Sequence, residues 1–237
     1  MSLSSSSSYL IVGSGRVATH IQHYLSLKNI PFLSWNRREY SDDDLDETLP
    51  RVSTVLLLIK DCAIEPFYEA HLRSFKGTIV HFSGTHCFEK IEGFHPLMTF
   101  GPTLYSLEFY EKIYFAGASA ERFHAVFPGL PNPVFVLDDT AKPLYHALCV
   151  MSGNFPQILW RDCLASFENL GVPSAAVSLY LQKNLENFIA HPAQSLTGPL
   201  ARGDMETVRK NIEALPDHLK PLYHAFVDFY MPSLRTR

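Results

Sequence analysis

The chain has 237 residues, of which 46% are hydrophobic, and it carries a formal net charge of −4 at pH 7. This length allows a nucleotide-binding fold together with one smaller domain. The acidic balance and scattered basic residues exclude an extended nucleic-acid footprint, and no apolar run reaches the roughly 18 residues that a membrane helix needs.

The N-terminal residues 1–8 contain a run of serines and lack the basic and apolar regions of a signal peptide, so we expect a disordered leader. Four cysteines lie far apart without a C-x-x-C spacing: Cys62, Cys87, Cys149 and Cys163. This pattern predicts neither a disulfide framework nor a zinc knuckle, and we expect small buried cysteines in a reducing compartment. The predicted location is cytoplasmic, with no metal.

Residues 9–21 have the pattern of a buried strand, a turn with two glycines and the start of a helix. Gly13 can turn the chain sharply, Gly15 lets the backbone approach phosphates, and Ala18 is small enough for the helix to pack closely on the strand. The N–H groups and the dipole of the first helical turn then favour an anion. The residues predicted to bind the pyrophosphate of a dinucleotide are Gly13, Ser14, Gly15, Arg16 and Val17.

The second predicted strand, 31–35, ends at Asn36, Arg37 and Arg38, with Glu39 only after them. An acidic residue about 20 positions after the glycines usually binds the ribose of NAD, whereas arginine accommodates the 2′-phosphate of NADP. These three residues therefore favour NADP over NAD. The alternative is two solvated arginines in a loop.

The third strand, predicted over 52–59, shows no alternation and so is expected to be buried on both faces. Its end, at Ile59 and Lys60, is expected to lie along the nicotinamide half of the cofactor. Before it, the acidic segment 42–47 is expected to be a solvated loop. After it, Asp61 is expected to cap a helix over 62–75.

A fourth strand over 78–82 places Ser83 at the same edge of the sheet, where it is predicted to contact ribose or substrate, or alternatively to cap a turn. The segment 93–102, which contains His95, is too irregular for a strand or a helix. Strands over 113–117 and 134–137, with a helix over 120–127, are expected to complete the same sheet.

From residue 140 the apolar residues recur at helical spacing. The expected helices span 144–169, with a kink at 153–156, then 174–190, 205–215 and 217–229. The predicted fold class is α/β: an N-terminal Rossmann domain with a doubly wound sheet over 9–139, followed by an all-α domain over 140–237.

The sequence resembles a family of NADP oxidoreductases in which a Rossmann domain precedes a helical domain of unknown function. The motifs that carry the resemblance are Gly13-Ser14-Gly15-Arg16-Val17-Ala18, His81-Phe82-Ser83-Gly84, His95-Pro96-Leu97-Met98-Thr99-Phe100, Leu144-Tyr145-His146-Ala147, Asn154, and Leu196-Thr197-Gly198-Pro199-Leu200-Ala201-Arg202-Gly203-Asp204. More remotely, the layout is similar to pyrroline-5-carboxylate reductase, ketopantoate reductase and the β-hydroxyacid dehydrogenases. The resemblance implies an NADP domain joined to helices that cover the substrate and often dimerise.

Hydroxyacid dehydrogenases of that wider group use a lysine and an asparagine one helical turn apart. Here the corresponding helix has His146 and Asn154, which an α-helix separates by roughly 12 Å along its axis and about 80° around it. We therefore consider them separately: His146 as general acid or as a packing residue, and Asn154 as a substrate contact or a partner of the kinked backbone. His95 is a rival acid, and Lys142 is a third candidate.

Two other groups of polar residues have plainer interpretations. In the segment 197–204, either glycine and proline shape a loop and Asp204 caps the next helix, or Arg202 reaches an anionic substrate or the active site of a partner subunit. His81, His86, Cys87 and His95 do not have a spacing that predicts a zinc site.

Together these features predict an NADP-dependent oxidoreductase that transfers hydride to or from a small acidic metabolite in the cleft between its domains. We expect a homodimer formed through the helical domain, with neither a nucleic-acid nor a membrane partner. The alternatives are a regulatory protein that binds NADP(H) without turnover, and an interaction protein in which the glycine turn is a relic.

Overall fold

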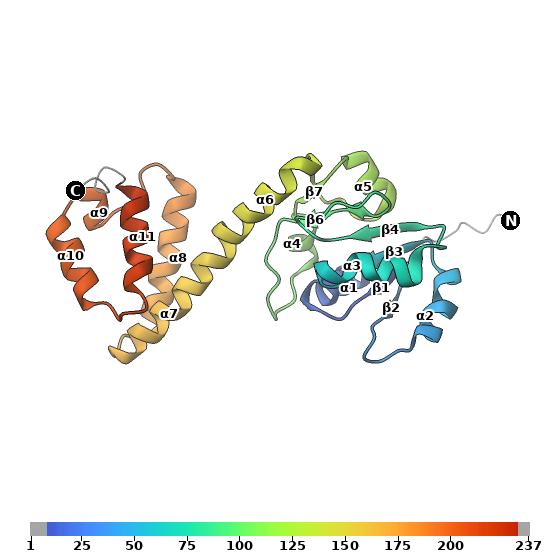
Figure 1. Cartoon of the computed structure of the whole chain (residues 1–237), viewed down its shortest axis with the longest axis horizontal. Coiled ribbons are helices and arrows are strands. Elements are labelled where there is room, and N and C mark those ends of the chain that lie inside the picture. Colours follow the sequence, from blue (N-terminus) through green and yellow to red (C-terminus); the bar gives the residue numbers. More distant parts are fainter. Residues whose placement is uncertain (1–8, 232–237) are drawn as a thin grey trace. The chain divides into compact units, whose positions relative to one another are not determined.

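The computed structural model describes residues 9–231, and the chain divides after Ile158 into two compact units (Figure 1). The predicted disordered leader, residues 1–8, lies outside the described residues. Among the described helices, none has both the length and the hydropathy of a membrane-spanning segment.

The first unit is built on a five-stranded parallel sheet with the strand order β2-β1-β3-β4-β5. Its strands are β1 (Tyr9–Val12), β2 (Phe32–Trp35), β3 (Thr54–Leu57), β4 (Thr78–His81) and β5 (Glu92–Gly93). Parallel neighbours require crossover connections, which α1 (Arg16–Leu27) provides between β1 and β2. The order reverses between β1 and β3, so the carboxyl ends of these strands form the switch point where ligands bind in open α/β sheets.

Helices cover both faces of this sheet because alternate residues of its central strands point to opposite sides. On one face, Tyr9 and Ile11 pack in a core with residues of α1, α4 (Leu107–Glu111) and α5 (Ala120–Val126). On the other face, Leu10 and Val12 pack with residues of α2 (Asp42–Thr48) and of the helical stretch made of α3 (Asp61–Phe67) and the π-helical segment Tyr68–Leu72. The predicted doubly wound, Rossmann-like domain is therefore confirmed.

The later strands do not complete this sheet, contrary to the prediction. They form a separate three-stranded sheet of β6 (His95–Pro96), β7 (Phe115–Gly117) and β8 (Val134–Val136), in which β6 is antiparallel to β7. One residue separates the end of β5 from the start of β6, and the chain leaves the first sheet at this point. β7 then pairs with β6 in the second sheet. The segment 93–102, which was predicted to be irregular, therefore contains the end of β5 and the whole of β6.

Two local predictions in the first unit are also wrong. The acidic segment 42–47 lies in α2, because Ser41 and Asp44 form a reciprocal capping box and the apolar Leu45 is fully buried. Cys62 and Cys87 are exposed rather than buried. Short 3₁₀ turns occur at Leu49–Arg51 and Asp139–Ala141.

The predicted helix over 144–169 is present, beginning slightly earlier, and the predicted kink coincides with a π-helical turn. The helical elements are α6 (Lys142–Cys149), the π-helical turn Val150–Asn154, α7 (Phe155–Asn169), α8 (Ser174–Ala190), α9 (Pro199–Arg202), α10 (Met205–Ala214) and α11 (Lys220–Tyr230). Of these, α6 and the π-helical turn lie in the first unit, and α8 to α11 in the second. The helical C-terminal region predicted from the sequence is therefore confirmed, as is the cap that Asp204 provides for α10.

Candidate functional site

The turn between β1 and α1 has a backbone that only glycine adopts readily at its first position. Gly13 has φ of +128°, and a Cβ there would lie 2.3 Å from the carbonyl oxygen of Leu58. Its own N–H donates to the Trp35 carbonyl oxygen at 2.9 Å. The turn is thus held tightly against the ends of β2 and β3, at the switch point of the sheet.

The amino end of α1 faces open space. Gly15 is its N-cap, no side chain caps the helix, and no acidic residue occurs in the first turn. A Cβ built on Gly15 would meet no heavy atom within 4 Å, and Ser14, Gly15 and Arg16 are exposed. Unpaired amides, a favourable helix dipole and room for close approach are the features that an anionic pyrophosphate requires.

The carboxyl end of β2 leads into a tight turn that presents two cations. Asn36 organises this turn, since its side-chain oxygen accepts from the Arg38 N–H at 3.2 Å and its amide donates to Glu39 at 3.1 Å. Arg37 and Arg38 are exposed, and within residues 9–231 neither guanidinium is in an ion pair. The acidic neighbour Glu39 is bonded to Asn36, so both arginines are available to a phosphate.

The ends of β3 and β4 are joined by a side-chain hydrogen bond. Ser83 donates from its hydroxyl to the Asp61 carboxylate at 2.7 Å, and the same oxygen accepts from the N–H groups of Thr85 and His86. Ser83 is therefore buried within a turn, which is the alternative considered from sequence. Asp61 does not cap α3 as predicted; Lys60 is the N-cap.

Two histidines, predicted from sequence as rival acids, lie together beside Gly84. The rings of His95, in β6, and His146, in α6, have centroids 5.9 Å apart and are nearly perpendicular. A Cβ on Gly84 would lie 2.6 Å from His146 Cδ2 and 2.9 Å from His95 Nε2. Only glycine at this position leaves room for both rings.

Tyr145, which the sequence analysis included in a motif without assigning it a role, completes this cluster. The Tyr145 hydroxyl is hydrogen-bonded to His95 Nδ1 at 2.8 Å. Burial, and then the nearby His146, lower the pKa of His95 to about 4, an effect that Asp61 partly opposes. His95 is therefore neutral near pH 7, and it can donate or accept a hydrogen bond but carries no charge.

The remaining predicted residues lie outside this cluster. Asn154 is exposed at the end of the π-helical turn, and Arg202 is exposed at the end of α9 in the second unit. No group of three or more potential metal ligands is found among the described residues. Lys142 is buried and ion-paired with Asp139.

Comparisons with known proteins agree with this fold. Residues 117–228 match the family described as a domain of unknown function, DUF2520. A crystal structure described as a putative NADP oxidoreductase from Bacteroides fragilis is similar with a TM-score of 0.78 and 18% identity, over 94% of this chain and 97% of that one. A search of curated proteins found no match.

Two reductases of known class share the fold at lower similarity. The 1-pyrroline-5-carboxylate reductase of Streptococcus pyogenes gives a TM-score of 0.58 at 13% identity, covering 97% of this chain and 98% of that one. The pyrroline carboxylate reductase of Plasmodium falciparum, solved with NADP bound, gives 0.54 at 9% identity, covering 95% and 97%. The chain therefore has the fold of NADP-dependent reductases, with a C-terminal domain of the DUF2520 type.

Proposed function

We propose that the protein is an NADP-dependent oxidoreductase that transfers hydride between the nicotinamide and a small acidic metabolite. The observation that carries the proposal is the uncapped amino end of α1, which follows an obligatory glycine at the switch point of a parallel sheet. The structural likeness to reductases supports it at the level of the fold. The nicotinamide supplies the hydride. The chain must bind and orient the cofactor and the substrate, and it must exchange a proton with the substrate.

The proposed cofactor site uses the carboxyl ends of three neighbouring strands. Gly13 shapes the turn and the backbone amides of residues 14–17 bind the pyrophosphate, while Arg37 and Arg38 bind the 2′-phosphate and Asn36 fixes their turn. Ile59 and Lys60, at the end of β3, lie along the nicotinamide half. The Ser83 hydroxyl is not free to bind the cofactor, because it donates to Asp61. In the proposed site, Ser83 therefore stabilises the carboxyl edge of the sheet through this hydrogen bond.

The proposed proton donor is His146, with His95 beside it. Both lie at the turn that follows β4, at the carboxyl edge of the sheet, where the reacting carbonyl or imine carbon is expected. A histidine can protonate the oxygen or nitrogen that becomes negatively charged as hydride arrives. Asn154 is a more distant candidate for a substrate contact.

Fluorescence titration with NADPH and NADH tests the cofactor assignment on the full chain. We expect saturable binding of NADPH and weaker binding of NADH. Absence of binding by either coenzyme would refute the proposal, including its regulatory alternative, because both require the same site.

Loss of NADPH absorbance with keto acids and imines, or its appearance when NADP is supplied with hydroxy acids, then separates an enzyme from a regulatory protein. His146→Gln is expected to lower kcat by at least 100-fold, the lower range for removing a general acid. His191→Gln, an exposed histidine after α8, is the matched control. Turnover that is unaffected by His146→Gln would remove this residue as the acid.

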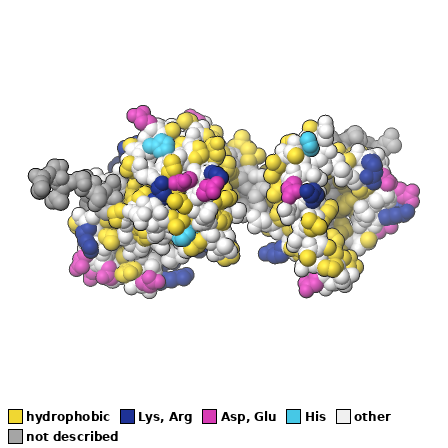
Figure 2. Space-filling model, turned by 180° about the vertical axis from the view of Figure 1, so that it is seen from behind, with side chains coloured by type: hydrophobic (Ala, Val, Ile, Leu, Met, Phe, Trp, Pro, Cys, Tyr) yellow, Lys and Arg dark blue, Asp and Glu magenta, His cyan; other side chains and the backbone are white. Residues whose placement is uncertain are grey.

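We also propose that a second copy of the chain covers apolar surface on the helical unit. Figure 2 shows hydrophobic side chains on the visible face of this unit. In α8 and α11, the large hydrophobic side chains that are more than half exposed are Leu179, Tyr180, Leu185, Phe188, Ile189, Phe226 and Phe229. Many large apolar side chains exposed to this extent are typical of an interaction surface.

Light scattering coupled to gel filtration is expected to give twice the chain mass of 26.8 kDa. Phe188→Glu is expected to shift the protein toward the monomer, because it places a charge in the apolar surface. Glu186→Gln, on the same helix, is the control. A monomeric wild-type protein would contradict the proposal.

A further inference from the structure

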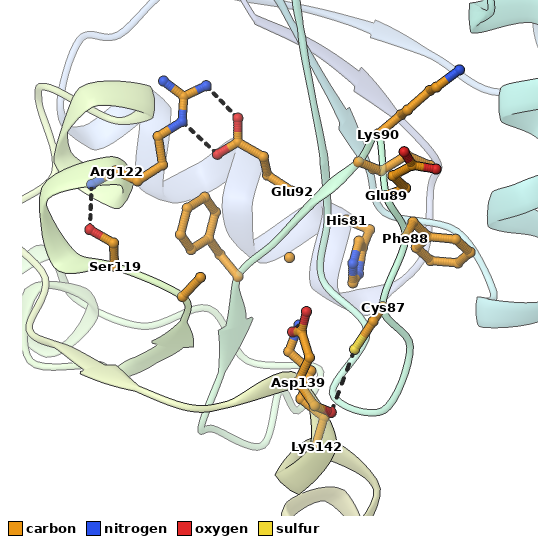
Figure 3. Close-up of a pocket in the computed structure, with 14 residues that line it drawn as sticks. His81, Cys87, Phe88, Glu89, Lys90, Glu92, Ser119, Arg122, Asp139 and Lys142 are labelled. Atoms are coloured by element: carbon orange, nitrogen blue, oxygen red, sulfur yellow. Dashed lines mark hydrogen bonds and ion pairs between the residues drawn. The ribbon is translucent and has the colours of Figure 1, made fainter.

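A cavity of about 320 Å³ lies in the first unit beyond the residues proposed for cofactor binding and proton transfer. Figure 3 shows side chains from four segments around it: the end of β4, residues 87–93, residues 118–122 and residues 139–142. His81 and Lys142 are its most deeply buried polar side chains, with 1% and 7% of their residue surfaces exposed. The space is about ten times the roughly 30 Å³ that one water molecule occupies.

The ring of His81 presents a hydrogen-bond donor without a partner. The Ser83 backbone N–H donates to His81 Nδ1 at 3.2 Å, so in the neutral ring the proton lies on Nε2. Burial, and then the nearby Lys142, lower the pKa of His81 to about 4, which keeps the ring neutral near pH 7. Nε2 is the one buried side-chain polar atom among the described residues that has no hydrogen-bond partner.

Lys142 brings a positive charge to the same point. Its Nζ is 2.8 Å from Asp139 Oδ1, which uses one of the three donors of the ammonium. A Cβ on Gly93 would lie 2.8 Å from His81 Nε2 and 3.2 Å from Lys142 Nζ. Both nitrogens therefore lie against one small region beside Gly93.

Of the other charged side chains of the cavity, Arg122 and Glu92 neutralise each other, whereas Glu89 and Lys90 are exposed. Arg122 is paired with both oxygens of Glu92, with a distance of 2.8 Å from its Nε to Oε2 (Figure 3). Phe88 packs against the His81 ring, with centroids 5.1 Å apart. Donors alone thus remain unsatisfied at the centre, so the ligand must bring acceptor oxygens.

We propose that this pocket binds the carboxylate of a small organic acid. One oxygen accepts from His81 Nε2–H and the other from the Lys142 ammonium. A carboxylate fits better than a phosphate dianion, because Lys142 is already partly neutralised by Asp139 and the neutral His81 adds no charge. The site uses neither the residues proposed for the cofactor nor His146 and His95, and it gives Lys142, the third acid candidate from sequence, a binding role instead. Its binding can be measured without NADPH.

The test on the wild-type chain is NMR of protein labelled with ¹⁵N at its histidines, titrated with acetate and succinate. His81→Gln assigns the His81 signals. We expect a saturable shift of the His81 Nε2 signal with both acids, and none with acetamide, which has the shape of acetate without its charge. No shift with either acid, or an equal shift with acetamide or inorganic phosphate, would overturn the proposal.

Two substitutions test the contacts directly. Lys142→Gln is expected to weaken succinate binding at least tenfold, with Lys112→Gln, an exposed lysine of the same unit, as control. Gly93→Ala is expected to block binding because its Cβ fills the space between the two nitrogens, whereas Gly101→Ala meets no atom within 4 Å. Unchanged succinate affinity in folded Lys142→Gln or Gly93→Ala protein would overturn the assignment.

These outcomes are independent of the proposed reductase activity. Titration without coenzyme reports the carboxylate alone, and NADPH titration without acid reports the cofactor alone. Competition between succinate and a turned-over acid would identify the carboxylate as part of the substrate. Simultaneous binding would identify a separate ligand of the same chemistry.

Discussion

The two glycines of the β1–α1 turn are expected to respond in opposite ways to alanine. Gly13→Ala places a Cβ 2.3 Å from the Leu58 carbonyl oxygen, a backbone atom that cannot rotate away. It also puts a side chain at φ of +128°. Backbone strain and overpacking each contribute about 1–3 kcal/mol, so we expect the free energy of unfolding to fall by about 2–6 kcal/mol.

Gly15→Ala meets no such obstacle. Its φ and ψ of −77° and 178° are accessible to any residue, and its Cβ has no neighbour within 4 Å. Loss of a glycine N-cap is worth about 1 kcal/mol or less. Because the new methyl lies where the pyrophosphate must approach, NADPH affinity should fall at least tenfold, which corresponds to about 1.4 kcal/mol.

Urea unfolding measures the first effect, with tryptophan fluorescence as the signal. Trp35 is buried in the first unit and Trp160 lies in the second, so Trp160→Phe leaves a reporter of the first unit alone. NADPH titration measures the second effect. A Gly13→Ala protein as stable as its parent, or a Gly15→Ala protein with unchanged NADPH affinity, would refute the reading of this turn.

Three further predictions concern charge and capping. Arg37→Gln and Arg38→Gln should each weaken NADPH binding about tenfold or more while leaving NADH unchanged, with Arg73→Gln as control; equal effects on both coenzymes would argue against a 2′-phosphate site. Asp204→Ala should destabilise the helical unit by about 1 kcal/mol, followed through Trp160 fluorescence, since it removes the cap of α10; an unchanged urea midpoint would contradict this. Because the pKa of His81 falls from 6.5 to about 4 on folding, the stability that its neutral form contributes is complete above pH 6.5 and is lost as the pH drops toward 4. Of the total, on the order of 3 kcal/mol, about 2 kcal/mol should be lost between pH 7 and pH 5. Urea midpoints at these two pH values should show this loss, with a smaller change in His81→Gln.

Local sequence patterns were sufficient for the first four strands of the first sheet, but they did not predict β5. Gly13 and the apolar strands around it define β1, β3 and β4 through short-range rules of turn geometry and burial. The same rules failed for the segment 42–47, because its acidic composition hid the capping box of Ser41 and the single buried Leu45. They also could not assign β7 to a second sheet, since pairing depends on where the chain lies after β5.

The candidate site was less accessible to sequence reasoning, because it depends on contacts between distant segments. His95 and His146 were recognised as separate candidates, but their pairing depends on Gly84, whose missing side chain is what admits both rings. The motif that contains His81 was recognised from the sequence, but the tautomer of the His81 ring was not predicted. That tautomer is fixed by the backbone N–H of Ser83, two residues later, which carries no signal in composition.

The pairing of the two histidines limits how a proton can move in the proposed site. The pKa of His95 is lowered to about 4, first by burial and then by His146 itself, so a proton shared by the pair does not reside on His95 near pH 7. His95 remains hydrogen-bonded to Tyr145 on the same helix as His146, which fixes its ring relative to α6. Burial thus keeps His95 neutral, so that in the proposed pair of histidines it is the residue that positions rather than the one that carries the proton. Because His146 is the proposed proton donor of the pair, substitution of His146 rather than His95 is the sharper test of the proposed reaction.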